Sequence, residues 1–188
     1  MRVYVVRHGE SEANLSKQFT GWMDVPLTDQ GRAQARGTGE FLQKIHFDKI
    51  YASDLCRARE TAEEAIPGCS YETTALAREI GVGDLMGKPL SSLTAEQKEA
   101  TVTRGYADYN GESKEQLYGR IRSLLTQMEK LDCETVAVFA HGGWLRAMLE
   151  TVLGTYLPRK HVCCENCAIG IFEYKDGNWA LHSWINPL

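Results

Sequence analysis

Short continuous apolar runs alternate with longer amphipathic stretches along this chain of 188 residues. Residues 3–6 and 135–140 are the clearest runs, and their β-branched side chains are typical of strands that are covered on both faces. Shorter apolar runs predict strands at residues 49–52 and near residues 71–74. The polar residues between these runs are numerous enough for a helix or a long loop to connect each pair of strands.

The stretches between the first runs show helical periodicity. Thr28 is a suitable N-cap for a helix over residues 29–45. The core contacts that we expect from this helix are Ala33, Phe41, Leu42 and Ile45. Residues 54–66 predict a second helix, which ends at Pro67-Gly68.

Three further helices are predicted in the second half of the chain. The first is capped by Ser92 or Thr94 and extends to about residue 103, and the others cover residues 112–131 and 143–153. One face of the 112–131 helix is apolar and should be buried; it carries Leu117, Ile121, Leu124, Leu125 and Met128.

The last two strands are predicted at residues 168–174 and 179–185, which flank Asp176-Gly177, a pair typical of a hairpin turn. The order of elements predicts a three-layer α/β/α sandwich, whose central sheet is mostly parallel and ends in this hairpin. The length suits a single domain over residues 1–188.

Composition narrows the class of protein. A formal net charge of −4 argues against a broad basic face for nucleic acid, although a small anion can still bind a local arginine cluster. No apolar stretch approaches transmembrane length, so we expect no membrane partner. The absence of a signal peptide and of a disulfide framework predicts a cytoplasmic protein with reduced thiols.

Six cysteines are present, three of them close together at Cys163, Cys164 and Cys167. This segment contains one C-x-x-C pair, but no second pair follows at the spacing of a zinc site. We therefore interpret these residues as ordinary thiols and expect neither a metal nor a cofactor, while the role of the cluster stays open.

The candidate chemistry lies directly after the predicted strands. Arg7-His8-Gly9 follows the first strand, Arg57 follows the second, and His141-Gly142 follows the run at 135–140. The carboxyl ends of parallel strands form the binding crevice of an open α/β sheet, so these segments should converge. Residues 10–26, which are polar and aperiodic, predict a long functional loop beside them.

These side chains suit phosphoryl transfer. A neutral imidazole at His8 can attack phosphorus, while Arg7, Arg57 and His141 can donate hydrogen bonds to the equatorial oxygens. Glu79 is the candidate general acid for the leaving group. Further donors toward the phosphate are expected from Asn14, Thr20 and the amide of Gly142.

Several segments together resemble the histidine phosphatase superfamily, which includes the cofactor-dependent phosphoglycerate mutases. The resemblance is carried, in order, by residues 7–14 (RHGESEAN), 19–22 (FTGW), 24–28 (DVPLT), 53–61 (SDLCRARET), 78–80 (REI), 111–113 (GES) and 141–143 (HGG). It implies the phosphoglycerate mutase-like fold, His8 as the nucleophile that becomes phosphohistidine, Glu79 in the acid segment, and Gly21 in the substrate site.

The resemblance leaves the reaction open between three functions. The favoured one is hydrolysis of a small phosphate monoester, because the family's mutases carry a long basic and proline-rich insertion, whereas residues 88–110 are short here. The cations of this stretch are Lys88, Lys98 and Arg104. Phosphoglycerate mutase activity and a non-catalytic phosphate-binding domain are the alternatives. In the family this segment often continues as Glu-Trp-Glu-Gly, whereas residues 84–87 are DLMG here, so the resemblance does not define the lining of the substrate pocket.

Overall fold

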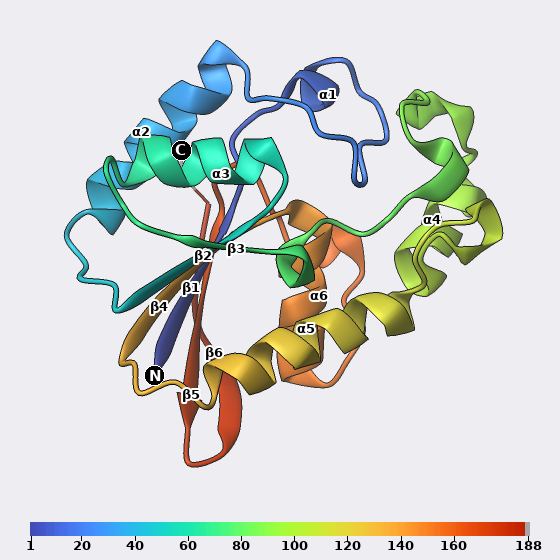
Figure 1. Cartoon of the computed structure of the whole chain (residues 1–188). Coiled ribbons are helices and arrows are strands. Elements are labelled where there is room, and N and C mark those ends of the chain that lie inside the picture. Colours follow the sequence, from blue (N-terminus) through green and yellow to red (C-terminus); the bar gives the residue numbers. More distant parts are fainter. Residues whose placement is uncertain (187–188) are drawn as a thin grey trace.

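A computed structural model describes residues 1–186 and contains one six-stranded sheet with the strand order β3-β2-β4-β1-β5-β6 (Figure 1). The strands are β1 (Arg2–Arg7), β2 (Lys49–Ser53), β3 (Glu72–Thr74), β4 (Thr135–Ala140), β5 (Ile169–Lys175) and β6 (Asn178–Ile185). The first four strands run parallel, and β5 and β6 are antiparallel to their neighbours. The predicted mixed sheet with a C-terminal hairpin is confirmed.

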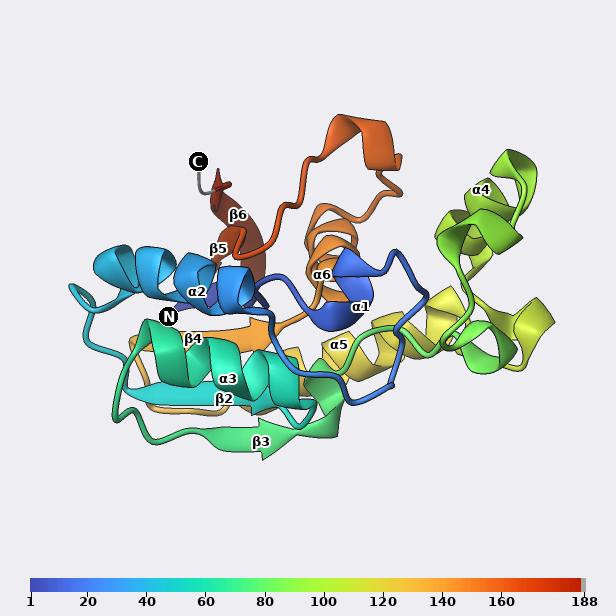
Figure 2. The ribbon, with the colours of Figure 1, turned by 90° about the horizontal axis from the view of Figure 1, so that it is seen from above.

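Helices cover both faces of this sheet, which gives the predicted three layers (Figures 1 and 2). The α-helices are α1 (Glu12–Leu15), α2 (Asp29–Leu42), α3 (Cys56–Ala65), α4 (Ala95–Arg104), α5 (Lys114–Met128) and α6 (Gly142–Leu153). Alternate residues of each central strand supply two separate apolar cores. Val3 and Val5 of β1 face the core beneath α5 and α6, and Tyr4 and Val6 face the core beneath α2 and α3.

The buried face of α2 differs from the prediction. Leu42 is fully buried, and Ile45 packs against the same core from just beyond the end of the helix, but Ala33 and Phe41 are exposed. The face that packs inward consists of small residues, including Gly39, where an added Cβ would lie 2.3 Å from the carbonyl oxygen of Ala65 on α3. The buried face of α2 is therefore decided by its close approach to α3, and not by the hydrophobicity of its side chains alone.

Some element boundaries also differ from the predicted ones. The long loop at residues 10–26 contains the short helix α1, whose N-cap is Ser11. Thr94 caps α4, whereas Ser92 belongs to a preceding 3-10 turn. Helix α3 begins two residues later than predicted, because Asp24 of the long loop accepts a hydrogen bond from the amide of Cys56 at 2.6 Å. The cap of this helix thus comes from a distant segment.

The carboxyl ends of the parallel strands point toward one side of the molecule, and α1 and the start of α6 lie on that side (Figure 2). The segment that carries α4 projects beyond it, away from the sheet (Figures 1 and 2). Among residues 1–186 there is no helix long and apolar enough to cross a membrane.

Candidate active site

His8 lies directly after β1, and its backbone amide donates to Ala140 of the neighbouring strand β4 at 3.0 Å. The ring atom Nδ1 is 2.6 Å from the carbonyl oxygen of Gly9. A carbonyl oxygen only accepts, so Nδ1 carries the proton and Nε2 carries the lone pair. Burial, followed by the positive charges of Arg57 and Arg7, lowers the pKa of His8 well below its ordinary value. The imidazole is therefore neutral and able to act as a nucleophile.

A second histidine stands against the first. The ring centroids of His8 and His141 are 5.1 Å apart, and the rings meet edge to face. His141 is the N-cap of α6, is fully buried, and has no hydrogen-bond partner for either ring nitrogen among the described residues. Burial, then the charge of Arg57, lowers its pKa well below the ordinary value. A buried polar group is stable only with a partner, so this ring is suited to a ligand oxygen.

Two arginines supply the positive charge of the site. Arg57 is 1% exposed, and its Nη1 and Nη2 donate to the carbonyls of Met23 and Gly21, each at 2.8 Å. Burial lowers the pKa of its guanidinium to about 10, so it keeps its charge at neutral pH. Arg7 donates from Nη1 to the carbonyl of Cys164. The Nε atoms of both arginines are buried and unpartnered within the described chain, which leaves each a donor for an anion.

A cleft of about 340 Å³ opens beside Arg7, whereas His8, Arg57 and His141 are not among the residues that line it. The predicted residues that line it are Arg7, Asn14, Thr20, Gly21, Glu79 and Gly142. The carbonyl oxygen of the Asn14 side chain already accepts from Ser11 and Asn166, so its amino group is the part that can donate to a ligand. Gly21 has φ +50°, and an added Cβ would lie 2.6 Å from a methyl group of Val82.

Glu79 reaches the cleft from the segment after β3. Its carboxylate accepts from the amides of Gly143 at 3.0 Å and Trp144 at 3.1 Å, both in the first turn of α6, and from its neighbour Ile80 at 2.9 Å. The positive end of α6 thus holds the carboxylate beside the cleft. Gly143 is required for this contact, since a Cβ there would lie 2.4 Å from Oε1 of Glu79.

Two other carboxylates that follow the nucleophile closely in sequence, Glu10 and Glu12, are weaker acid candidates and do not reach this position. The carboxylate of Glu10 accepts a hydrogen bond from the hydroxyl of Thr28 at 2.8 Å, and Glu12 is exposed on α1. Neither residue lines the cleft. The three remaining histidines, His46, His161 and His182, are exposed and do not line the cleft.

Several residues of the site were not predicted from the sequence. Gln18, Phe19, Ile80, Val82, Leu90, Tyr106, Gly143, Arg146 and Cys164 also line the cleft. Phe19, Ile80 and Gly143 stand in the segments that carry the family resemblance, which was a usable signal. Arg146 follows Gly143 by three residues and so shares its helix face. Behind the cleft, the indole nitrogen of Trp22 donates to the carbonyl of Glu79 at 2.7 Å and fixes the acid segment from its outer side.

The cysteine cluster has a structural part in the site. The backbone carbonyl of Cys164 accepts from Arg7, and Cys167 is fully buried. Burial raises the pKa of the Cys167 thiol to about 11, and Cys163 is exposed. Residues 1–186 include no group of three side chains arranged to hold a metal ion.

Comparison with known proteins identifies the family. The sequence profile of the histidine phosphatase superfamily (branch 1) matches residues 3–187. The chain therefore belongs to the histidine phosphatase superfamily.

Its relatives in that family carry two kinds of name. A probable phosphoglycerate mutase, GpmB, of Salmonella paratyphi A is 30% identical and aligns over 98% of this chain and 90% of its own length. A phosphoglycerate mutase from Thermus thermophilus has 30% identity and a TM-score of 0.77 over 100% of this chain and 99% of its own. A mycobacterial glucosyl-3-phosphoglycerate phosphatase has 26% identity and a TM-score of 0.86, and the match covers 97% of this chain and 98% of its own.

Proposed function

We propose that the protein is a phosphatase that hydrolyses a small phosphate monoester through a phosphohistidine at His8. In the first step Nε2 of His8 attacks phosphorus and the bond from phosphorus to the ester oxygen breaks, while Glu79 gives its proton to that oxygen. In the second step water attacks the phosphorus, Glu79 takes a proton from it, and the bond from phosphorus to Nε2 breaks. Phosphate and an alcohol are the products, and both side chains return to their initial states.

The arrangement of His8 is the observation that carries this proposal. Nδ1 of His8 donates to the carbonyl oxygen of Gly9, with 2.6 Å between the two atoms, so Nε2 carries the lone pair. Because the pKa of His8 is lowered, this lone pair is free of a proton at neutral pH. A histidine kept only for structure has no need of a neighbouring pair of arginines with unpartnered Nε atoms.

The charge that develops on the phosphoryl oxygens is met by Arg7, Arg57 and His141. Their donors are already fixed by the protein, so little reorganisation is needed when the transition state forms. The amino group of Asn14 and the amide of Gly142 are further donors in our proposal, with Thr20 and Gly21 shaping the entrance. We assign no step to a metal or cofactor.

Glu79 is suited to the acid and base roles by its place at the start of α6. When it has given its proton to the leaving group, the resulting carboxylate is stabilised by the amides of Gly143 and Trp144. The same carboxylate then stands ready to accept a proton from water. This arrangement favours an enzyme over a phosphate-binding domain, because binding alone does not use a proton donor.

Phosphoglycerate mutase activity is the second candidate, since relatives at 30% identity carry that name. A mutase must retain a doubly phosphorylated intermediate, which favours extra cations at the entrance. The segment at residues 88–110 contributes Leu90 and Tyr106 to the cleft lining, and both are uncharged. Its Arg104 is paired with Asp108 at 3.3 Å. The segment at residues 88–110 thus gives the cleft no cation, which favours hydrolysis, and the further cation of the lining is Arg146 of α6.

The experiment is a search for phosphohistidine during turnover of p-nitrophenyl phosphate. Mass spectrometry of the quenched enzyme should show phosphate on His8, and His8→Ala should abolish turnover while the circular dichroism spectrum stays unchanged. His182→Ala is the matched control, because His182 is exposed. Near-normal activity of His8→Ala would overturn the mechanism. Product analysis with glycerate phosphates distinguishes the two activities, since a phosphatase releases inorganic phosphate and a mutase releases the isomeric ester.

A further inference from the structure

A turn just before β5 lies against the backbone of the candidate nucleophile. The amide of Ala168 donates to the carbonyl of Glu165 at 3.0 Å, which closes the turn. Between them, the backbone amide of Cys167 and the side-chain amino group of Asn166 both donate to the carbonyl oxygen of His8, each at 3.2 Å. The peptide bond that follows His8 is therefore fixed from a segment that is 158 residues distant in the sequence.

The backbone of this turn is strained. Cys167 has a φ of +61°, a left-handed conformation that residues with a side chain rarely adopt. Such conformations persist where the surrounding structure determines them, and they gather at functional sites. The turn is held on its other side as well, because the amide of Arg7 donates to the carbonyl of Ala168 at 2.9 Å. The turn is thus bound to both Arg7 and His8, the last residue of β1 and its successor.

The carbonyl oxygen of His8 sets the direction of two side-chain amides. This oxygen only accepts, so the end of Asn166 that faces it is the amino group, Nδ2. Nδ2 also donates to Oδ1 of Asn14 at 3.3 Å, and that oxygen accepts from the backbone amide of Ser11 at 3.1 Å. Two donors thus fix the oxygen end of the Asn14 amide. The amino end, on a residue that lines the cleft, is left for a phosphoryl oxygen.

We propose that Asn166 is a positioning residue for phosphoryl transfer, which acts through Asn14 and the backbone of His8. The inference rests on the proposed function. Asn166 does not line the cleft, so it has no place against the substrate itself. Its amino group instead turns the donor of Asn14 toward the phosphate. It also fixes the planar peptide from which Gly9 continues, and the carbonyl of Gly9 in turn holds Nδ1 of His8.

A double-mutant cycle with Asn14 tests the positioning role. The rate measured is phosphoryl transfer to His8 in a single turnover of p-nitrophenyl phosphate. Asn166→Ala should lower this rate about 10-fold, because Asn14 is no longer held with its amino group toward a charged oxygen. In the Asn14→Ala protein, the same substitution should cost no more than about 3-fold, since only the contact with His8 remains to be lost. Equal factors in the two backgrounds would overturn the inference.

Two further variants grade the loss of the donors. Asn166→Ser offers one hydroxyl donor in place of two N–H groups, so its rate should lie between those of the wild type and Asn166→Ala. Asn166→Asp keeps the shape of the side chain but turns a carboxylate toward two acceptor oxygens, so it should be at least as slow as Asn166→Ala. A rate for Asn166→Asp near that of the wild type would contradict the positioning role. If Asn166→Ala fails to fold, Asn166→Ser takes its place in the cycle.

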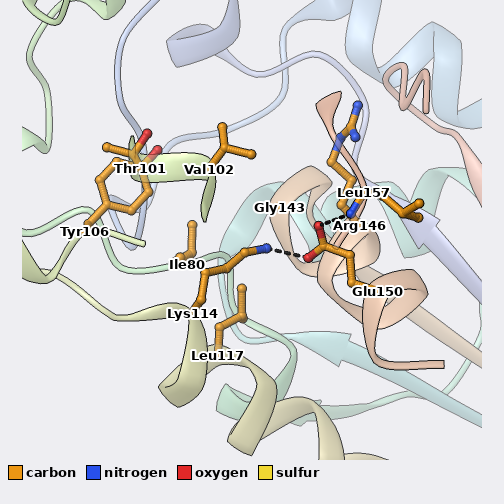
Figure 3. A pocket seen from close by; sticks show the side chains of 10 residues that line it. All are labelled: Ile80, Thr101, Val102, Tyr106, Lys114, Leu117, Gly143, Arg146, Glu150 and Leu157. Atoms are coloured by element: carbon orange, nitrogen blue, oxygen red, sulfur yellow. Dashed lines mark hydrogen bonds and ion pairs between the residues drawn. The ribbon is translucent and has the colours of Figure 1, made fainter. Parts of the chain in front are cut away.

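Two variants control for effects on the fold alone. Asn178→Ala removes a similar bond in the exposed hairpin turn, where the side chain donates to the carbonyl of Asp176 at 2.9 Å, and it should leave the rate unchanged. Glu150→Gln removes one charge of a buried ion pair beside an inner cavity of about 40 Å³, where Nζ of Lys114 lies 2.5 Å from Oε2 of Glu150 (Figure 3). It should lower the free energy of unfolding, yet any loss of rate should be the same factor with and without Asn14. A coupling to Asn14 as large as that of Asn166 would count against the inference.

Failure of this inference is distinguishable from failure of the proposed function. If the wild-type enzyme forms phosphohistidine, but Asn166→Ala reacts at a near-normal rate or shows no coupling to Asn14, the positioning role alone is contradicted. If the wild-type enzyme forms no phosphohistidine with any ester, the proposed function and the positioning role are contradicted together.

Discussion

Arg120 and Glu112 form a two-pronged ion pair behind the candidate acid, with Nε to Oε1 at 2.6 Å and Nη2 to Oε2 at 2.8 Å. The same guanidinium donates to the carbonyl of Leu76 at 2.8 Å and to that of Glu79 at 3.2 Å. Glu112 in turn accepts from the amide of Gly81 at 3.1 Å. The pair therefore holds the backbone of the acid segment from both sides of Glu79.

Loss of this pair should disturb proton transfer as well as stability. In Arg120→Lys the charge remains but the fork is lost, so we expect the free energy of unfolding to fall by about 2 kcal/mol. The kcat for an alkyl phosphate should fall more than that for p-nitrophenyl phosphate, because only the alkyl ester needs the acid. Arg122→Lys is the control. If kcat fell by the same factor for both esters, Arg120 would contribute to the stability of the fold and not to proton transfer.

The role of Glu79 is tested by the leaving group. Glu79→Gln keeps the size of the side chain but removes the proton, so an alkyl phosphate should lose about 10²–10⁴-fold in its rate of phosphoryl transfer to His8. The nitrophenolate ion leaves without protonation, so its ester should lose much less in this step. Single-turnover kinetics measure the step directly, and burst kinetics reveal whether dephosphorylation becomes limiting. Equal losses for both esters would assign Glu79 a binding role.

Gly143→Ala should impair activity through the candidate acid. The added methyl group would lie 2.4 Å from Oε1 of Glu79, so the carboxylate must move from the start of α6. We expect kcat for an alkyl phosphate to fall about 10-fold or more, as for other displaced catalytic groups. Gly119→Ala is the matched control on α5, where a Cβ meets no atom within 4 Å.

The control variant has an expected result of its own. Gly119→Ala should leave kcat unchanged and raise the free energy of unfolding by about 0.4–1 kcal/mol, because alanine restricts the unfolded chain. Chemical denaturation of both variants measures this effect. Unchanged activity in Gly143→Ala would contradict the proposed position of the carboxylate during catalysis.

Stability should fall as the solution becomes acidic. The pKa of His8 and that of His141 lie well below 6.5 in the folded protein, whereas in the unfolded chain both return to about 6.5. Below pH 6.5 and above the folded pKa, the unfolded state binds protons that the folded state does not. Each histidine therefore removes up to about 1.4 kcal/mol of stability per pH unit in this window, and nothing above it.

Urea denaturation between pH 7 and pH 5 measures this slope. Replacement of one buried histidine, as in His141→Gln, should make the slope shallower, whereas His182→Gln should leave it almost unchanged because His182 is exposed. A wild-type slope that survives in His141→Gln would assign the acid sensitivity to other groups.

Activity should not depend on a divalent metal ion. Arg7 and Arg57 can neutralise the phosphate charge, and the start of α6 adds further positive potential. We therefore expect full kcat with p-nitrophenyl phosphate after dialysis against EDTA. A strict requirement for added magnesium or zinc would contradict the proposed charge neutralisation.

The strands were predictable from the sequence because their signal is local. Residues 135–140 form one strand as predicted, and the first strand extends only one residue beyond the apolar run at each end. A continuous run of buried β-branched side chains has few alternatives. The face of α2 was not predictable in the same way, because contact between Gly39 and Ala65 depends on a second helix.

The succession of strands along the chain and the polar residues directly after them predicted that Arg7, His8 and His141 lie close together at one edge of the sheet, and the rings of His8 and His141 are in contact there. Only the tertiary structure decided that the carboxylate of Glu79 meets the first turn of α6, 64 residues further along the chain. It also decided that Arg146 lines the cleft. Periodicity and propensity describe neighbours in sequence, whereas these contacts depend on how separate helices and loops pack in space.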